Sequence, residues 1–291
     1  MLKIKRDGKE LKATVSKVFL RDSLSEVSDS CDIEMLFDDF DVMQTLDAGY
    51  QITIEHEGEE LGTFEVTNVS INENSVIKMN TDSICATQSM KTPRSETFRN
   101  ERLSSIIKKI GQRYNLDVFI SKELKEVMIS YIAQVATSDL NFLSDLAATY
   151  GADIKLNANK LLFMSSNFDV LGHAELGEIS SYSIKRNLVD CCKTVNAMFL
   201  KQLISVGEGS PVYEIPQIYY NEDEARIAAQ NLLKTFKRKE FNLDVTTTLN
   251  TDIKSGVTVT FKEQEWIVFD AVHTMGSDSF HQTSLSAYLK Q

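Results

Sequence analysis

The sequence predicts a β-rich α+β fold in which two β-domains flank a small α+β insert. Strand-like patterns dominate both ends of the chain, and the segment 100–164 between them has helical periodicity. With 291 residues and 42% hydrophobic content, the chain is long enough for about two domains with real cores. It has three prolines and no Gly/Ser-rich tract, so we expect the domains to pack against one another without a flexible linker between them. The expected boundaries are 1–90, 91–167 and 168–291.

The first β-domain is predicted from short apolar runs between Leu2 and about Ala86. In the stretch Gln51 to Glu55 polar and apolar residues alternate, which is typical of a sheet with one buried and one wet face. Gly49, Gly58 and Asn-rich stretches punctuate the runs. Several short strands at regular spacing favour a barrel or a sandwich.

The insert begins with a helix that carries an apolar face and ends in the region 111–115. A short strand over 117–120 follows, and then IAQVATS (132–138), which we interpret as a polar segment. The apolar face of the helix is predicted from residues spaced three or four apart, namely Leu103, Ile106, Ile107 and Ile110.

Sequence signals predict both ends of the second helix of the insert. Ser138 can cap the first turn, and Asp139 suits the positive end of the helix dipole. Gly151 ends the helix, because glycine enters the left-handed conformation without steric cost. Two apolar runs, 152–156 and 161–164, then predict a hairpin around Asn157 and Asn159. The apolar face of this helix is formed by Leu140, Leu143, Leu146, Ala147 and Tyr150.

The second β-domain contains strand patterns and one clear helix, 221–239. Asn221 caps this helix, acidic residues fill its first turn, and basic residues fill its last turn, so the charges complement the dipole. The predicted strand regions are 178–187, 193–200, 211–220, 241–249, 256–275 and 282–289. Six helix residues are expected to be buried or partly buried: Ala225, Ala228, Ala229, Leu232, Leu233 and Phe236.

Composition excludes several classes of protein. No run approaches the roughly 18 to 20 apolar residues of a membrane span, and the N-terminus lacks a signal-peptide core, so we expect no membrane insertion and a chain that stays in the cytoplasm of its producer. The net charge of −11 disfavours wrapping of nucleic acid, which depends on neutralising phosphates. An acidic surface still suits a conduit through which DNA slides without sticking.

No catalytic or metal-binding motif stands out, so we expect no enzyme activity and no cofactor. The cysteines lack a CxxC pair and are interpreted as reduced, mostly buried residues, and the histidines lack metal-ligand spacing. His273 and His281 could meet across a hairpin. Asp278, Ser279 and His281 contain triad residue types, but no GxSxG turn accompanies them. The cysteines are Cys31, Cys85, Cys191 and Cys192, and the remaining histidines are His56 and His173.

Acidic clusters at 38–41 and 55–60 leave one enzymatic alternative open. A muramidase needs two carboxyl groups, one with a raised pKa and one ionised. Acidic turns and strand edges in water explain the same clusters, and charged edges also deter wrong strand pairing. The stretch Gly207 to Ser210 lacks the flanks of a phosphate-binding loop and is expected to be an ordinary loop.

Three segments, in this order, resemble the phage late control gene D family of tail hub proteins. The first, 90–116, joins a basic Thr-Pro-Arg-Ser link and an aromatic residue to a helix. The second, 138–163, contains Leu-Ala-x-x-Tyr-Gly-Ala and the hairpin. The third runs from the Ala-rich helix at 221–239 through IKSGVTVTF and EWIVFDAVHTM to a final Thr-x-Leu strand. Together they cover about two hundred residues.

The resemblance implies a structural baseplate hub of a contractile injection particle, such as a phage tail or a tail-like bacteriocin. Related hubs form the N-terminal part of type VI valine-glycine repeat spike proteins. In this family two tube-like β-barrel domains per chain form, in a homotrimer, a pseudo-sixfold ring that joins the sixfold tail tube to the threefold central spike. The implied partners are the tail tube protein, the central spike protein and other baseplate proteins, with DNA or tape-measure protein passing through the lumen.

Three further expectations concern the lumen, the C-terminus and an alternative function. The lumen should be acidic or neutral, with Glu55, Glu57, Glu59 and Glu60 as candidate lining residues. The chain ends at Gln291 without an appended needle or lysozyme domain, so we expect any spike or wall-degrading activity on another chain. The alternative function is a baseplate-associated protein that binds or degrades peptidoglycan, with the insert touching the cell wall.

Overall fold

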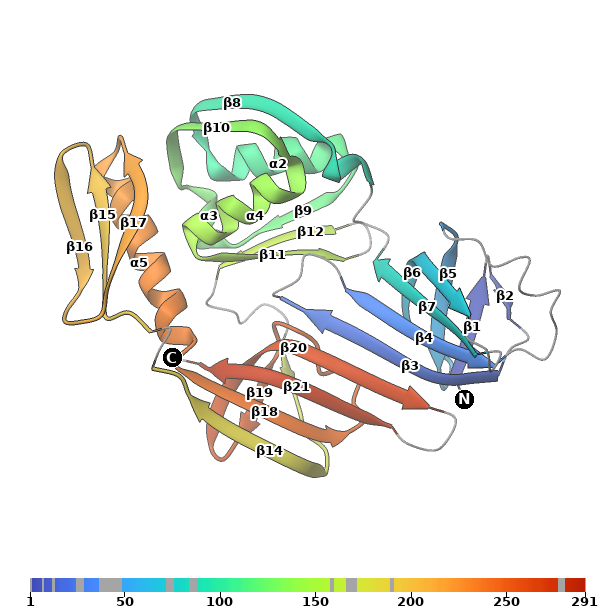
Figure 1. Cartoon of the computed structure of the whole chain (residues 1–291). Coiled ribbons are helices and arrows are strands. Elements are labelled where there is room, and N and C mark those ends of the chain that lie inside the picture. Colours follow the sequence, from blue (N-terminus) through green and yellow to red (C-terminus); the bar gives the residue numbers. More distant parts are fainter. Residues whose placement is uncertain are drawn as a thin grey trace.

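The structure is a computed structural model that describes most of the chain and is rich in strands (Figure 1). The described residues are 2–6, 8–11, 14–24, 29–36, 49–71, 76–83, 88–157, 160–165, 172–188, 191–276 and 281–290. The acidic cluster 38–41, Cys85, Asn159, Asp278 and Ser279 lie outside them.

The described residues of the N-terminal part form seven strands. They are β1 (Leu2–Arg6), β2 (Lys9–Glu10), β3 (Thr14–Ser23), β4 (Ser30–Leu36), β5 (Gln51–His56), β6 (Glu59–Ile71) and β7 (Val76–Ser83). Alternate residues of these strands are buried, as the predicted half-buried sheet requires. The buried residues form a core that includes Val18, Ile33, Ile54 and Met79.

The C-terminal part supplies further strands to the same sheet. These are β13 (His173–Ala174), β14 (Ile179–Arg186), β18 (Phe241–Thr248), β19 (Thr258–Phe261), β20 (Gln264–Gly276) and β21 (Gln282–Leu289). They enclose a second core around Trp266, Val268 and Leu285. Both cores lie on one face of the sheet, because Val18 and Leu20 of β3 share that face with Ala271 and Met275 of β20.

The two β-parts are joined into one sheet, which differs from the expected pair of separate barrels. Strand β3 pairs antiparallel with β20 from Lys17↔Gly276 to Ser23↔Asp270. The resulting 13-stranded sheet has the order β14-β18-β21-β20-β3-β4-β7-β6-β5-β1-β2, and β19 pairs with β20 and in turn with β13. Within the described residues no sheet closes into a barrel.

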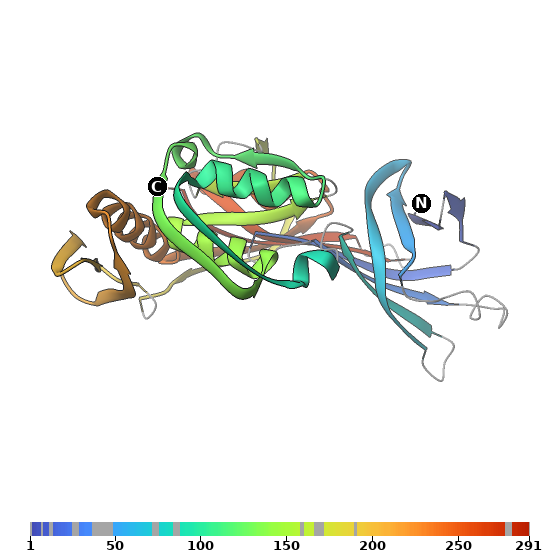
Figure 2. The same ribbon diagram turned by 90° about the horizontal axis from the view of Figure 1, so that it is seen from above.

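The insert is a compact α+β unit that lies over the C-terminal part of the sheet, while the N-terminal strands extend to one side (Figure 2). Its core includes Phe98, Ile106, Leu143 and Phe163. Its elements are η1 (Gln88–Lys91), β8 (Pro93–Arg102), α2 (Leu103–Arg113), β9 (Asp117–Ile120), α3 (Lys122–Lys125), β10 (Met128–Ser138), α4 (Asp139–Tyr150), β11 (Ala152–Asn157) and β12 (Lys160–Ser165).

Helix α4 follows its predicted ends. The Ser138 Oγ accepts a hydrogen bond from the Asn141 amide at 3.1 Å, and Gly151 adopts the left-handed conformation at φ 61°. A Cβ at Gly151 would lie 2.5 Å from Cβ of Asn231, so glycine is required both for the turn and for the approach of α5. Leu143, Leu146, Ala147 and Tyr150 are buried as predicted, and Leu140 is partly buried.

Residues 132–138, interpreted from the sequence only as a polar segment, belong to a strand that was not predicted. They form the second half of β10, which pairs antiparallel with β8. A register shift between Gln134 and Thr137, with Ala136 at φ 48°, interrupts the alternation by which a strand is recognised.

Helix α5 (Glu222–Arg238) is capped by Asn221, whose side chain accepts a hydrogen bond from the Asp223 amide at 2.9 Å. All six residues expected to be buried or partly buried are so. The helix does not cover the large sheet. It packs instead on a separate three-stranded sheet of β15 (Thr194–Phe199), β16 (Gln202–Gly207) and β17 (Val212–Tyr219), and also contacts α4. Residues 208–210 form the expected loop.

We predict that Leu143→Asp destabilises the insert by several kcal/mol, because it places an unpaired charge among fully buried apolar side chains. The matched control is Asn141→Asp, an exposed position on the same helix, which should stay within about 0.5 kcal/mol of the wild type. Urea unfolding followed by circular dichroism measures both variants. Equal stability of the two would show that this helix face is not a packing surface.

Candidate functional site

One face of the large sheet carries mostly polar side chains, except at the end where Ile267 of β20 and Tyr288 of β21 pack against Met164 of the insert. Along one row of paired residues it presents Ser181, Thr246, Ser284, Val272, Arg21, Ser30, Asp82 and Glu65, each from a different strand. Such side chains alternate with the buried ones along every strand, as the pleat of a sheet dictates. We call this surface the polar sheet face. It spans the strands β14, β18, β21, β20, β3, β4, β7 and β6 and therefore both β-parts.

Most of the basic groups on the polar sheet face are neutralised locally. Arg21 pairs with Asp270 at 2.9 Å, Lys78 with Glu34 at 2.6 Å, and Lys185 with Asp244 at 2.7 Å. The carboxylates on the face outnumber the basic groups: Asp32, Glu34, Glu65, Asp82, Asp244 and Asp270 against Lys17, Arg21, Lys78 and Lys185. The face is thus weakly acidic and rich in hydroxyl groups.

The four glutamates proposed from the sequence do not gather on this face. Glu55 forms an ion pair with Lys5 of β1. Glu57 is exposed in the turn between β5 and β6, at φ 53°. Glu59 and Glu60 begin β6 and line a pocket of about 300 Å³ between the two β-parts.

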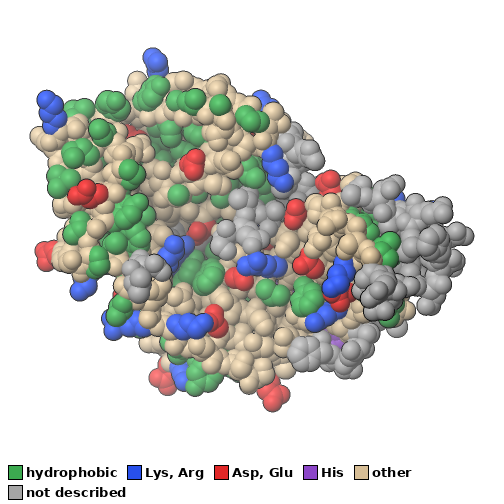
Figure 3. All heavy atoms as spheres, viewed as in Figure 1, with side chains coloured by type: hydrophobic (Ala, Val, Ile, Leu, Met, Phe, Trp, Pro, Cys, Tyr) green, Lys and Arg blue, Asp and Glu red, His purple; other side chains and the backbone are tan. Residues whose placement is uncertain are grey.

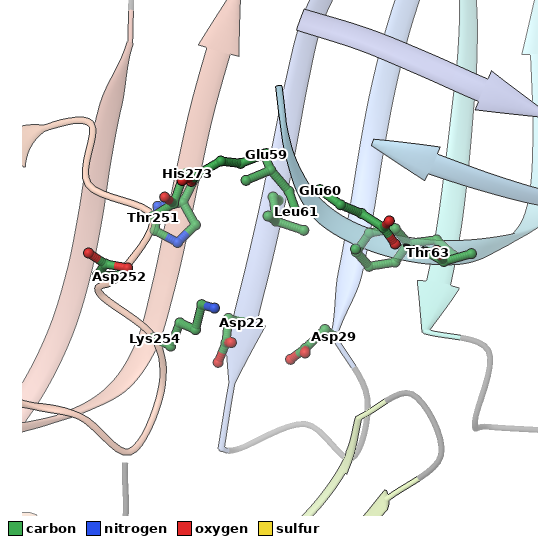
Figure 4. A pocket seen from close by; sticks show the side chains of 13 residues that line it. Asp22, Asp29, Glu59, Glu60, Leu61, Thr63, Thr251, Asp252, Lys254 and His273 are labelled. Carbon is green, nitrogen blue, oxygen red and sulfur yellow. Dashed lines mark hydrogen bonds between the residues drawn. The ribbon is translucent and has the colours of Figure 1, made fainter. Parts of the chain in front are cut away.

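That pocket brings together groups from both β-parts (Figure 4). The N-terminal strands contribute Asp22, Asp29, Glu59 and Glu60, and the C-terminal part contributes His273 on β20 and the loop that carries Thr251, Asp252 and Lys254. Their proximity depends on the strand register across the β3/β20 junction, which pairs distant segments and could not be predicted from local sequence patterns.

Beside the pocket, three parts of the chain meet at the buried side chain of Lys155, which comes from β11 of the insert. Its Nζ lies 2.5 Å from Oδ1 of Asp22, 3.0 Å from Oδ1 of Asp29 and 2.9 Å from Oγ of Ser255. The Ser255 amide also donates to Asp22 at 2.9 Å. Lys155 is only 2% exposed, so its charge depends on these partners. We call these four residues the Lys155 cluster.

Two titratable groups near the pocket are strongly perturbed. Burial, reinforced by the negative charge of Asp22, raises the pKa of Asp29 to about 6, although Lys155 opposes the shift. Burial also lowers the pKa of His273 to about 4. The imidazole of His273 is therefore neutral at pH 7, and its Nδ1 lies 2.9 Å from the Thr283 hydroxyl.

The structure separates the two histidines that were expected to meet across a hairpin. His273 contacts Thr283, whereas His281 lies against His56 with ring centroids 5.4 Å apart. Among the described residues no group of three or more His, Cys, Asp or Glu side chains is arranged to hold a metal ion. Cys31 is buried, and Cys191 and Cys192 are partly exposed; none of these three described cysteines forms a disulfide.

None of the helices in the described part of the chain combines the length and the apolar character that a membrane crossing needs.

Comparison with known proteins finds one similar stretch of sequence and several similar folds. No family model matches the chain. A 77-residue segment is 29% identical to the "Probable baseplate hub protein" of Escherichia phage 186, which is 26% of this chain and 20% of that protein.

Solved structures match over nearly the whole chain. The 43 kDa tail protein of prophage MuSo2 from Shewanella oneidensis aligns over 98% of this chain and 97% of its own, with a TM-score of 0.75 and 14% identity. The tail protein from Neisseria meningitidis MC58 aligns over 99% and 95%, with a TM-score of 0.78 and 10% identity. An E. coli type VI secretion component, described as similar to the T4 tail proteins gp27 and gp5, aligns over 99% and 77%, with a TM-score of 0.71 and 11% identity.

The chain therefore has the fold of phage tail proteins and of a type VI secretion component. The resemblance to the late control gene D family of tail hubs, seen in the sequence, is confirmed by the baseplate hub match together with these neighbours.

We predict that Lys155→Met destabilises the protein by about 3–5 kcal/mol, because it leaves the carboxylates of Asp22 and Asp29 buried without their cation. Lys160→Met, at an exposed position on the neighbouring strand β12, serves as the control and should behave like the wild type. Thermal and urea unfolding of both variants at pH 7.5 measure the difference. A wild-type midpoint for Lys155→Met would contradict a structural role for the cluster.

Proposed function

We propose that the protein is a structural hub of a contractile tail or tail-like particle, a trimeric adaptor between the sixfold tail tube and the threefold central spike. The main support for this proposal is that one continuous sheet contains strands from both β-parts. Four of its strands (β14, β18, β21, β20) come from the C-terminal part and four (β3, β4, β7, β6) from the N-terminal part. Two similar wall units are thus fused in one chain, and both expose the same polar face.

This arrangement offers a physical route from threefold to sixfold symmetry. Three chains with two wall units each present six units, so a ring of three can match a sixfold tube on one side. The strand β14 lies at an edge of the sheet, and its unpaired backbone groups are available for pairing with a neighbouring chain. In this proposal each β-part forms a tube-like domain within the ring, and the boundaries near residues 90 and 167 separate these domains from the insert.

The polar sheet face is the proposed channel surface. Its hydroxyl groups and its excess of carboxylates over basic groups suit a wall past which DNA or a tape-measure protein moves without binding. The hairpin that carries Glu55, Glu57, Glu59 and Glu60 is a second candidate for a channel-facing segment. The proposed partners are the tube, spike and baseplate proteins of the assembled particle, and the proposed role is not enzymatic.

One observation at the pocket supports the enzymatic alternative. It contains several carboxyl groups, and the raised pKa of Asp29 is a property of general acids in glycoside hydrolases. However, both Asp29 and Asp22 pair with Lys155, and this engagement removes them from contact with a substrate. Zymography of the purified protein on peptidoglycan separates the alternatives: the hub proposal expects no clearing, and clearing that is lost in Glu59→Gln or Glu60→Gln would support the enzyme.

We predict that the chain assembles as a trimer when its ring closes. Multi-angle light scattering of the purified protein over a concentration series measures its mass. The expected species are monomer and trimer, because ring closure adds two interfaces in one step. A stable dimer would contradict the proposed ring.

We predict that Ser284→Lys on the polar sheet face leaves particle assembly intact but reduces DNA ejection by about tenfold, because the added positive charges attract phosphates. Thr97→Lys, at an exposed position on the insert, is the matched control and should eject normally. A third variant, Glu57→Lys, tests the β5/β6 hairpin in the same assay. Normal ejection by Ser284→Lys with reduced ejection by Glu57→Lys would move the channel surface to the hairpin.

A further inference from the structure

The Lys155 cluster is the point where the insert touches both β-parts through charged groups. Lys155 belongs to the insert, Asp22 and Asp29 to the N-terminal part, and Ser255 to the C-terminal part. Asp22 and Ser255 also bond directly to each other, through the Ser255 amide and hydroxyl. An apolar contact accompanies the cluster, in which Met164 of β12 packs with Leu24, Ile267 and Tyr288.

The charges in the cluster do not balance when both carboxyl groups are ionised. One ammonium group then faces two carboxylates, and little water reaches them, since the side chains of Lys155, Asp22 and Asp29 are 3%, 12% and 13% exposed. The pocket beside the cluster adds Glu59 and Glu60 from β6, Asp252 and Lys254 from the loop, and His273 from β20. Among these groups Lys254 is the only lysine or arginine, against the three carboxyl groups of Glu59, Glu60 and Asp252, so the pocket lining does not supply the missing positive charge.

We propose that the Lys155 cluster is a proton-sensitive joint, in which uptake of one proton by Asp29 removes the buried excess charge and tightens the contact of the insert hairpin with both β-parts. When the proton leaves, the two carboxylates repel each other across a site of low dielectric, and the hairpin opens more often. This joint does not depend on the hub role, because it rests only on contacts within the chain.

The direction of the pH effect follows from linkage. The pKa of Asp29 is raised to about 6 in the closed joint by burial and then by Asp22, whereas an open joint returns the carboxyl to its ordinary value near 4. The closed state therefore binds the proton more tightly, and it gains stability as the pH falls through 6 and loses it as the pH rises. His273 stays neutral across this range, since burial lowers its pKa to about 4.

Hydrogen exchange measured by mass spectrometry at pH 5.0 and 7.5, corrected for intrinsic exchange rates, tests the joint in the full chain. Peptides that cover β11 should be about tenfold better protected at pH 5.0 than at pH 7.5 in the wild type. Asp29→Asn and Asp29→Ala, which cannot ionise, should lose this pH dependence. The control Glu60→Gln removes an exposed pocket carboxylate that accepts a hydrogen bond from Thr63 and lies outside the Lys155 cluster, and this variant should keep the pH dependence.

Three outcomes would overturn the proposal. The first is equal protection of β11 at both pH values in the wild type. The second is an Asp29→Asn variant that retains the wild-type pH dependence, which would assign the titration to another group. The third is loss of the folded state in both Asp29 variants at pH 7.5, because the proposed joint requires that removal of the excess charge be tolerated.

Discussion

The antiparallel pairing of β3 with β20 is the constraint on which the rest of the structure depends. It joins residues about 250 positions apart, such as Arg21 and Asp270, whose side chains also form an ion pair at 2.9 Å. Without this pairing the two β-parts would be separate units with exposed strand edges. With it, they form one sheet and both cores lie on the same face. The opposite face is then continuous and mostly polar, apart from the end where Ile267 and Tyr288 pack against Met164 of the insert.

The same pairing sets the position of the insert. Asp22 lies on β3 at the junction, and the loop that carries Ser255 belongs to the C-terminal part, so their approach creates a place where Lys155 is both buried and paired. The ion cluster is costly to desolvate, and its role is better understood as orientation than as net stability. It fixes the insert against both β-parts, while apolar contacts around Met164 supply the favourable burial.

Local signals in the sequence were sufficient to predict the helices but not to predict how the strands pair into the sheet. The caps at Ser138, Gly151 and Asn221 act within a few residues, so they could be read directly. The strand β8 could not be predicted in this way, because its sequence PRSETFRNER is almost entirely polar and only Phe98 is deeply buried. The strand β10 was hidden by its register shift. The continuity of the sheet depends on pairing between distant segments, for which a single sequence contains no signal.

The contacts of the candidate site also could not be predicted from the sequence, because they join distant segments. The acidic hairpin at Glu55 to Glu60 was visible as composition, but its carboxylates turn out to face Lys5, solvent and the pocket rather than one common surface. Lys155 lies in a run that the sequence presents as an apolar strand, and its partners are 100 residues or more away. Exposed apolar side chains gather elsewhere, on β10, on the three-stranded sheet and just after β17, where Figure 3 shows hydrophobic groups at the surface. They include Tyr131, Val135, Leu203, Ile218 and Tyr220.

The central claim is that both β-parts of three chains surround a channel with the polar sheet face turned inward. A cryo-EM reconstruction of the particle that contains this protein tests it most directly. The account predicts a threefold ring with six wall units between tube and spike, and with Thr246, Ser284 and Arg21 facing the axis. A reconstruction in which the polar sheet face is buried against another protein, or in which the chain lies away from the axis, would contradict it.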